Sequence, residues 1–175
     1  MSSVPMYCLM TEEDFNNAIE NGETCENLAP SEFSVTEDDD FSYYVDYISS
    51  TEVHETKEER VEAAENIAHY LGNFARVDES GVLEIPVDGK KKFATEKLKN
   101  VKKLVEDMTA EDFCGMGEYL LRQEIRNEGI FAYPLGENMS VGCYIHPMDT
   151  FIYDLPSSLD KPLRLVVIQT MWLHR

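Results

Sequence analysis

The chain has 175 residues, with 34 acidic side chains against 15 basic ones and 43% apolar residues. This length suits one compact domain, and the apolar share excludes a disordered polyelectrolyte. The net charge of -19 opposes contact with phosphate backbones and anionic lipid, which require Lys and Arg, so ordinary nucleic-acid binding is not expected. No apolar run reaches the ~20 residues that cross a bilayer, and the start lacks a signal-peptide pattern, so neither membrane insertion nor secretion is expected.

The cysteines indicate a reducing compartment. Cys8, Cys25, Cys114 and Cys143 stand far apart, with no CxxC pair. This spacing favours reduced thiols over a disulfide framework or a four-thiolate zinc site. We therefore expect a cytoplasmic protein that carries no metal or other cofactor.

The charge is unevenly distributed along the chain. Residues 1–60 contain 16 acids and only Lys57 and Arg60, whereas residues 61–175 contain 18 acids and 13 bases. Seven lysines fall between Lys90 and Lys103. We interpret them as the solvent face of a helix near 97–103 that balances the acids, with a small anion site as the alternative.

The first elements predicted are a strand and a helix. Met6–Met10 is a short apolar run typical of a strand. Thr11-Glu-Glu-Asp14 has the spacing of a capping box, which starts a helix, and Asn21-Gly22 ends it.

A second capping-box spacing occurs at Thr36–Asp39. The apolar residues after it recur at i, i+3, i+4 and i+7: Phe41, Tyr44, Val45 and Ile48. This spacing predicts a helix over 37–49. A strand is the alternative, because Tyr, Val and Ile favour sheets and residues 41, 43, 45 and 47 alternate.

The clearest helix begins after Thr56, which forms a capping-box pattern with Glu59 and precedes an apolar stripe about 100° wide. Residues 77–85 predict a hairpin that turns at 79–81. Two more helices are expected over 93–107 and 110–128. Their apolar positions are Ala94, Leu98, Val101 and Val105 in the first, and Phe113, Met116, Leu120, Leu121 and Ile125 in the second.

After Gly129 the hydrophobic period changes to two, which predicts strands over 130–135, 141–146, 150–153 and 163–173. Residues 165–168 are apolar at consecutive positions, so the last strand is expected to be central and covered on both faces. The order of elements predicts an α+β fold, with several helices packed on a mostly antiparallel sheet of C-terminal strands joined by the N-terminal strand.

We expect these elements to form a single domain over residues 1–175. Its parts are an acidic N-terminal third (1–60), a helical middle (54–128) and a strand-rich C-terminal part (130–173).

Two groups of residues raise the alternative of a metal-dependent enzyme. His54-Glu55-Thr56-Lys57-Glu58 begins like a zincin helix, but Glu58 stands where the second His is required. Glu62, Glu65 and His69 lie on one side of the predicted helix, and a carboxylate with a His four residues on can bind a metal. A solvated helix face is the favoured interpretation, because di-iron bundles need Glu-x-x-His on two helices.

A thiol-dependent enzyme would use Cys143 and His146, with Cys114 as a further candidate. Strand alternation points residues 143 and 146 to opposite faces unless the strand bends. A buried structural cysteine and a turn histidine are therefore favoured over a Cys-His nucleophile pair.

The strongest functional signal is an acidic surface that also carries tyrosines. If residues 37–49 are helical, acids and tyrosines alternate on their exposed side, and the helix after Thr56 presents an acidic ridge. Like charges at i, i+3 and i+4 destabilise a helix by a few tenths of a kcal/mol per pair, so stability alone does not favour this ridge. Tyrosine is common at binding hot spots. The predicted partner-binding residues are Asp39, Tyr43, Asp46, Tyr47, Glu55, Glu58, Glu62 and Glu65.

We therefore expect an acidic interaction protein, not an enzyme, that binds and blocks a basic surface of another protein. Duplex DNA carries one charge per ~1.7 Å, so 16 carboxylates match roughly eight base pairs of phosphate. One expected target is a nucleic-acid-binding enzyme, which this chain blocks as a nucleic-acid mimic of the antirestriction or anti-CRISPR type. The other is a basic toxin, for which this chain is the immunity protein. A structural domain whose acidity has no further role is the remaining alternative.

Overall fold

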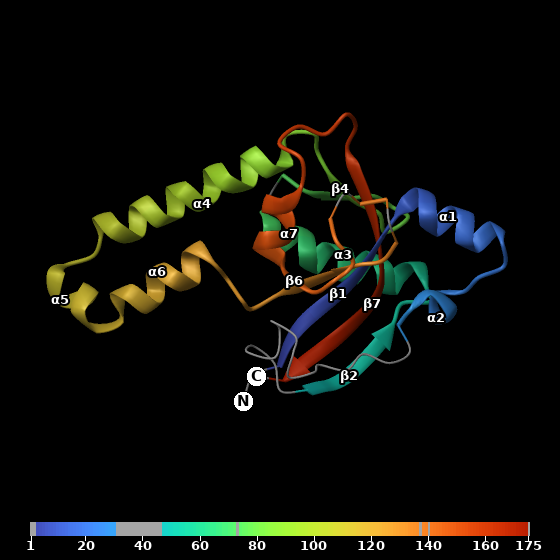
Figure 1. The fold of residues 1–175 in the computed structure, drawn as a ribbon, viewed down its shortest axis with the longest axis horizontal. Coiled ribbons are helices and arrows are strands. Elements are labelled where there is room, and N and C mark those ends of the chain that lie inside the picture. Colours follow the sequence, from blue (N-terminus) through green and yellow to red (C-terminus); the bar gives the residue numbers. More distant parts are fainter. Residues whose placement is uncertain (1–2, 31–46, 73, 137, 140, 175) are drawn as a thin grey trace.

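The computed structural model describes residues 3–30, 47–72, 74–136, 138–139 and 141–174 (Figure 1). The strands are β1 (Ser3–Thr11), β2 (Tyr47–Val53), β3 (Arg76–Val77), β4 (Leu83–Ile85), β5 (Phe131–Pro134), β6 (His146–Pro147) and β7 (Leu163–His174). The helices are α1 (Glu12–Glu20), α2 (Cys25–Leu28), α3 (Lys57–Leu71), α4 (Gly89–Glu106), α5 (Ala110–Asp112), the π-helix η2 (Phe113–Gly117), α6 (Glu118–Ile125) and α7 (Met148–Asp154).

The described strands form one mixed sheet in the order β3-β4-β7-β1-β5-β6, with β2 also paired to β7. β1 runs antiparallel along β7, from Ser3 opposite His174 to Thr11 opposite Leu165. On its other side β7 pairs with β4 near one end and with β2 near the other. Only β1 and β5 pair in parallel within the described sheet. The predicted α+β fold is confirmed, including the central last strand and the N-terminal strand that joins it.

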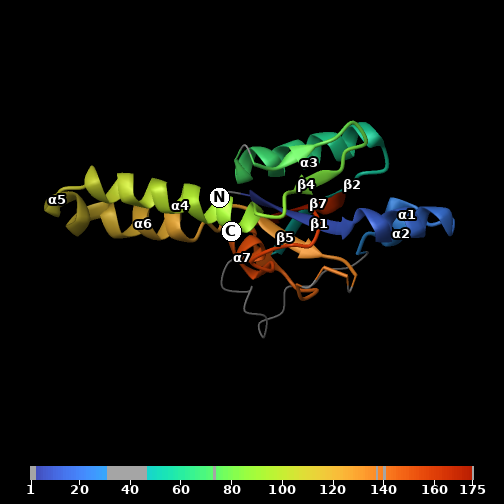
Figure 2. The same cartoon turned by 90° about the horizontal axis from the view of Figure 1, so that it is seen from above.

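α3 packs along one side of the sheet (Figure 2). Its apolar stripe is buried, and Ile67 shares the main core with Leu9 of β1 and Val167 of β7. Its start is fixed by a complete capping box between Thr56 and Glu59. The capping residue predicted for α1 is also present, since Thr11 Oγ1 accepts the backbone N–H of Asp14 at 3.2 Å. Among the described residues, no helix is both long and apolar enough to cross a bilayer.

The strand predicted over 150–153 is wrong, because these residues belong to α7. Met148, Phe151, Ile152 and Leu155 stand at i, i+3, i+4 and i+7 and are all buried in the main core. Burial of this helical face outweighs the strand preference of Thr, Phe, Ile and Tyr.

The strand predicted over 141–146 is also wrong, except for its last residue. Only His146 and Pro147 pair with β5, as β6. Before them the chain makes a tight turn, in which the backbone N–H of Tyr144 donates to the carbonyl of Gly142 at 2.9 Å. Gly142 favours such a turn, and Pro147 cannot donate to a longer ladder.

Most of the helix predicted over 37–49 lies outside the described residues. Its last part, Tyr47 to Ser49, is the start of β2 and not helical. Tyr47 and Ile48 pair with His174 and Leu173 at the end of β7. Cross-strand pairing therefore decides the conformation there, in favour of the strand alternative for Tyr47.

α4, α5, η2 and α6 form a helical arm, residues 89–125, that projects from the rest of the molecule (Figures 1 and 2). α4 begins at Gly89, four residues earlier than predicted. The helix predicted over 110–128 is interrupted at Gly115, whose φ of -91° and ψ of -108° are not helical. As a result α6 turns back alongside α4.

Candidate functional site

A small polar pocket of about 110 Å³ lies where the first turns of α3 meet β2 and β7. Three carboxylates, Glu52, Glu59 and Glu62, line it, together with the side chains of His54, Thr170 and Trp172. We call it the acidic pocket. Its volume corresponds to a few water molecules, at about 30 Å³ for each in the liquid.

Strand register brings the sheet residues of the pocket together. Glu52 stands opposite Thr170, and Ser50 stands opposite Trp172. Paired residues share a face of the sheet, and so do residues two apart along a strand. Glu52, Thr170 and Trp172 therefore line one face, the one that the start of α3 approaches.

The capping box positions the helix residues of the pocket. Glu59 Oε2 accepts the backbone N–H of Thr56 at 3.0 Å. This backbone hydrogen bond is the main reason that the pKa of Glu59 is lowered. Glu62 follows at i+3, on the same side of the helix. Both carboxylates thus line the pocket from the N-terminal part of α3.

The floor of the pocket holds a buried histidine. His54 is 4% exposed, and its Nε2 lies 2.7 Å from Thr170 Oγ1. Within the described residues its Nδ1 has no hydrogen-bond partner. Burial lowers the pKa of His54 and outweighs the opposing effect of Glu52 and Glu59. The ring is therefore neutral at pH 7, and it leaves the carboxylates without a cationic partner.

The nearest arginine is also occupied. Arg60 Nη1 donates to the carbonyl oxygens of His54 at 3.0 Å and Glu55 at 2.9 Å, and its guanidinium lies over the ring of Phe15. Among the described residues, no salt bridge reaches any of the three pocket carboxylates. The pocket thus presents negative charge that the neighbouring side chains do not balance.

Five of the predicted partner-binding residues lie in the described part of the chain. Glu62 lines the acidic pocket, and Glu58 and Glu65 are exposed on the same helix. Glu55 is exposed, and its Oε1 accepts the backbone N–H of Glu26 at 2.7 Å, which ties it to α2. Tyr47 is 53% exposed and stacks on the ring of His174, with the centroids 4.6 Å apart.

The other three, Asp39, Tyr43 and Asp46, lie outside the described residues. Of the predicted partner-binding residues that the structure describes, Glu62 is the one that lines the acidic pocket. Tyr47 stands on the same sheet face, because its partner His174 is two residues from Trp172.

Sequence reasoning missed most of the pocket. Glu52 and His54, in and just after β2, meet Thr170 and Trp172 of β7, more than 100 residues away in the sequence. His54 was a candidate only as the start of a failed zinc motif. A signal in these strands was Trp172, the single tryptophan of the chain, near the end of the strand predicted over 163–173.

The residues of the enzyme alternatives have separate partners. The thiol of exposed Cys143 donates to the carbonyl of Gly136 at 3.0 Å, whereas buried His146 contacts the carbonyl of Gly142 at 3.0 Å. Glu65 and His69 are both exposed on α3. In the part of the chain that the structure describes, no group of three His, Cys, Asp or Glu side chains could hold a metal ion.

A second cluster of titratable groups lies at the base of the helical arm, beside a groove of about 840 Å³. Asp149 is 1% exposed and accepts the hydroxyl of Tyr70, and its Oδ2 lies 3.1 Å from Lys97 Nζ. Burial, together with Asp149, raises the pKa of Tyr70. Lys97 is thus not part of the solvent face predicted for the lysines, because it is paired inside the fold.

Carboxylates beside an indole ring are suited to an organic cation. The carboxylates supply charge-assisted hydrogen bonds, and the ring face of a tryptophan attracts a cation electrostatically. A lysine or arginine side chain has the charge and the donors that the acidic pocket lacks.

Comparison of this chain with known protein families, with curated proteins and with solved structures found no match.

Proposed function

We propose that this chain is an acidic interaction protein that binds a basic surface of a partner protein, and that the acidic pocket receives a lysine or arginine side chain of that partner. The observation that carries the proposal is the convergence of Glu52, Glu59 and Glu62 beside Trp172, with no salt bridge to them among the described residues. A partner cation would supply the missing charge.

The surroundings of the pocket support a larger contact. Glu58 and Glu65 extend the negative surface along α3, and Tyr47 extends the aromatic surface along the sheet. Such charges steer a basic partner toward the site, whereas aromatic rings supply most of the affinity. Asp39, Tyr43 and Asp46 stay predictions from the sequence, because they lie outside the described residues.

The proposed target is a nucleic-acid-binding enzyme, which this protein blocks as a mimic of nucleic acid of the antirestriction or anti-CRISPR type, or a basic toxin that it neutralises. Both kinds of target have a surface rich in Lys and Arg. We place the complex in the cytoplasm, in keeping with four unpaired cysteines.

Trp172 allows a direct test, since it is the only tryptophan and lines the pocket. Short arginine and lysine peptides are titrated into the protein at low ionic strength, and the fluorescence of Trp172 is followed. We expect a saturable change that added salt weakens, because salt screens exposed charges. Glu52→Gln with Glu62→Gln should weaken binding at least tenfold, whereas Glu20→Gln, an exposed acid on α1, should leave it unchanged.

Equal binding by the pocket variant and the Glu20 variant would overturn the proposed role of the pocket. Affinity purification at low ionic strength, followed by mass spectrometry, identifies the partner. Recovery of only a salt-sensitive background would contradict the wider function. Elemental analysis of the purified protein tests the alternative of a metal enzyme, for which stoichiometric metal is required.

A further inference from the structure

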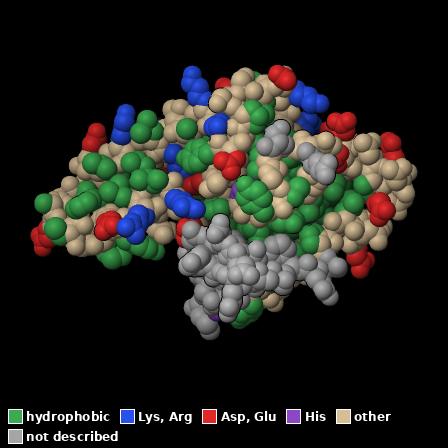
Figure 3. Space-filling view, viewed as in Figure 1, with side chains coloured by type: hydrophobic (Ala, Val, Ile, Leu, Met, Phe, Trp, Pro, Cys, Tyr) green, Lys and Arg blue, Asp and Glu red, His purple; other side chains and the backbone are tan. Residues whose placement is uncertain are grey.

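The helical arm leaves its apolar residues uncovered. Leu98 and Val105 of α4 are 55% and 52% exposed, and Met116 and Leu120 are 63% and 45% exposed. These residues belong to the apolar stripes that identify both helices in the sequence. Figure 3 shows hydrophobic side chains spread over the surface of the arm. An apolar stripe normally turns a helix toward a core, but on α4 the stripe of Leu98 and Val105 faces outward.

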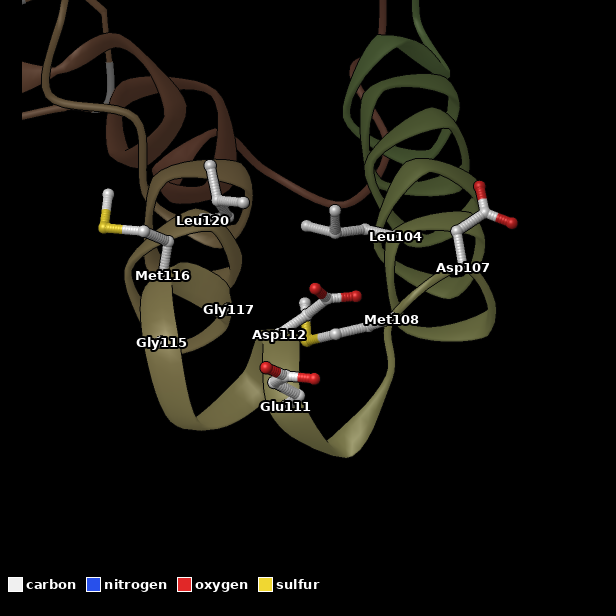
Figure 4. Close-up of a pocket in the computed structure, with 9 residues that line it drawn as sticks. All are labelled: Leu104, Asp107, Met108, Glu111, Asp112, Gly115, Met116, Gly117 and Leu120. Atoms are coloured by element: carbon white, nitrogen blue, oxygen red, sulfur yellow. The ribbon is translucent and has the colours of Figure 1, made fainter.

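α4 has a second apolar face, which is turned toward α6. Leu104 of α4 reaches toward α6 across a hollow of about 350 Å³, which Met116 and Leu120 also line (Figure 4). On α4, Leu104 lies about 120° from Leu98 at 100° per residue. A helix with two apolar faces is typical of a four-helix bundle, in which it contacts two neighbours. The arm supplies two of the four helices.

The charge of the arm changes sign along its length. Residues 90–103 contain one acid, Glu96, and seven lysines, of which Lys97 is paired with Asp149 and six remain to face other partners. The tip, residues 106–112, contains four acids and no base: Glu106, Asp107, Glu111 and Asp112. Asp107 and Glu111 stand at the edge of the hollow at this tip. If a second, identical arm lies antiparallel to the first, the acidic tip of each arm meets the lysines of the other.

We infer that a second copy of this chain covers the arm, with the two arms antiparallel in a two-fold symmetric four-helix bundle. A two-fold interface must be self-complementary, and the arm meets this condition in both apolar surface and charge. A uniformly basic partner would meet the lysines unfavourably, and a uniformly acidic one would meet the tip unfavourably. Antiparallel overlap along α4, about 27 Å at ~1.5 Å per residue, also keeps the two acidic bodies at opposite ends.

This dimer uses a surface other than the acidic pocket, so a test of the dimer does not test the proposed function. Sedimentation equilibrium of the full chain over a wide concentration range should show a monomer-dimer equilibrium. Leu98→Ser with Met116→Ser should weaken the dimer at least tenfold. Both side chains are exposed, so the circular dichroism and the thermal unfolding of the variant monomer should match those of the wild type.

A charge exchange tests the antiparallel arrangement. At 100° per residue Lys91 and Lys102 lie within about 40° of Leu98, and Lys103 lies about 140° away. We expect Lys91→Glu with Lys102→Glu to be monomeric alone, and Glu106→Lys with Glu111→Lys likewise, because each copy then repels its twin. Glu106 is exposed and lies about 80° from Leu98. Mixed together, the two variants should form a heterodimer, since both charged contacts are restored. Lys103→Glu is the matched control and should dimerise as the wild type does.

A monomer at every concentration, or a dimer that Leu98→Ser with Met116→Ser leaves unchanged, would overturn the inference. A dimer that the apolar variant disrupts, but whose charge variants show no rescue on mixing, would overturn the antiparallel arrangement.

Discussion

Lys97 connects three helices through its ammonium group. Its Nζ lies 3.1 Å from Oδ2 of Asp149 in α7 and donates to the carbonyl of Glu124 in α6 at 3.0 Å. The side chain of Asp149 is 1% exposed and that of Lys97 is 16% exposed. The contact therefore joins α4 and α6, at the base of the helical arm, to α7 in the core.

Removal of the ammonium group should destabilise the protein. Lys97→Met leaves the buried carboxylate of Asp149 with two partners among the described residues, the hydroxyl of Tyr70 and the backbone N–H of Asn127. Breaking a buried ion pair from one side typically costs about 3–5 kcal/mol. Urea denaturation followed by circular dichroism measures the loss. Lys99→Met, at an exposed position of the same helix, should change the stability by less than about 0.5 kcal/mol.

His54 should make the stability depend on pH near neutrality. Burial lowers its pKa below the ordinary 6.5 in the folded state, so the unfolded chain binds the proton first as the pH falls. The contribution of neutral His54 is complete above pH 6.5 and is lost as the pH falls toward the folded pKa.

The pH dependence is checked by urea denaturation from pH 7.5 to the onset of carboxylate protonation. His54→Gln should flatten the curve, whereas His69→Gln, which removes an exposed histidine of the neighbouring helix α3, should leave its slope as in the wild type. Equal slopes for the wild type and His54→Gln would show that the ring does not titrate differently on folding.

Arg164 should maintain stability in acid. Its guanidinium contacts carboxylate oxygens of Glu12 at 3.0 Å, Asp78 at 2.6 Å and Glu84 at 2.7 Å, which joins α1, β4 and the loop after β3 to β7. Although burial opposes it, hydrogen bonds from Ser80, Val82 and Arg164 hold the pKa of Asp78 at about 2. The contribution of the ionised carboxylate is therefore kept above pH 3.8 and lost as the pH falls toward 2.

Arg164→Gln should raise the pKa of Asp78 and move the acid unfolding midpoint to higher pH. At neutral pH we expect a loss of about 1–2 kcal/mol, since the side chains are about one third exposed and solvent screens them. Arg122→Gln is the control, because Arg122 and Glu118 are mostly exposed and such pairs contribute less than about 1 kcal/mol. The prediction fails if the two variants unfold at the same pH.

Thr56 should stabilise α3 through its hydroxyl. Thr56 Oγ1 accepts the backbone N–H of Glu59 at 3.2 Å, and loss of an N-cap hydroxyl costs about 1 kcal/mol. Thr56→Ala should lower the free energy of unfolding by about this amount, and Thr56→Ser should retain most of it. Thermal unfolding compares the two. An alanine variant as stable as the serine variant would contradict the role of the cap.

Local sequence patterns predicted an element correctly where the residues that determine it lie within one short segment. The capping box predicted at Thr56 is complete in the structure, because it needs only a hydroxyl and an acid three residues apart. β7 was recognisable from four consecutive apolar residues. α7 also carried a helical spacing, from Met148 to Leu155, but its Thr, Phe, Ile and Tyr residues favoured a strand, and burial against the core decided between the two.

The candidate site could be predicted only in part. The exposed acids of α3, among them Glu62, follow from helix periodicity within one segment. The pocket itself depends on Glu52 standing opposite Thr170, and a one-residue change of register would turn Glu52 to the other face of the sheet. Sequence periodicity does not report that register.

The sequence by itself determined the α+β class, the acidic character and the helices that begin at capping boxes, because these depend on residues close together in the chain. Tertiary structure alone decided that β2 pairs with β7, that the carboxylates of β2 and α3 meet at one pocket, and that the stripe of Leu98 and Val105 faces outward. Periodicity shows that a helix has an apolar face. What that face contacts depends on the packing of distant segments.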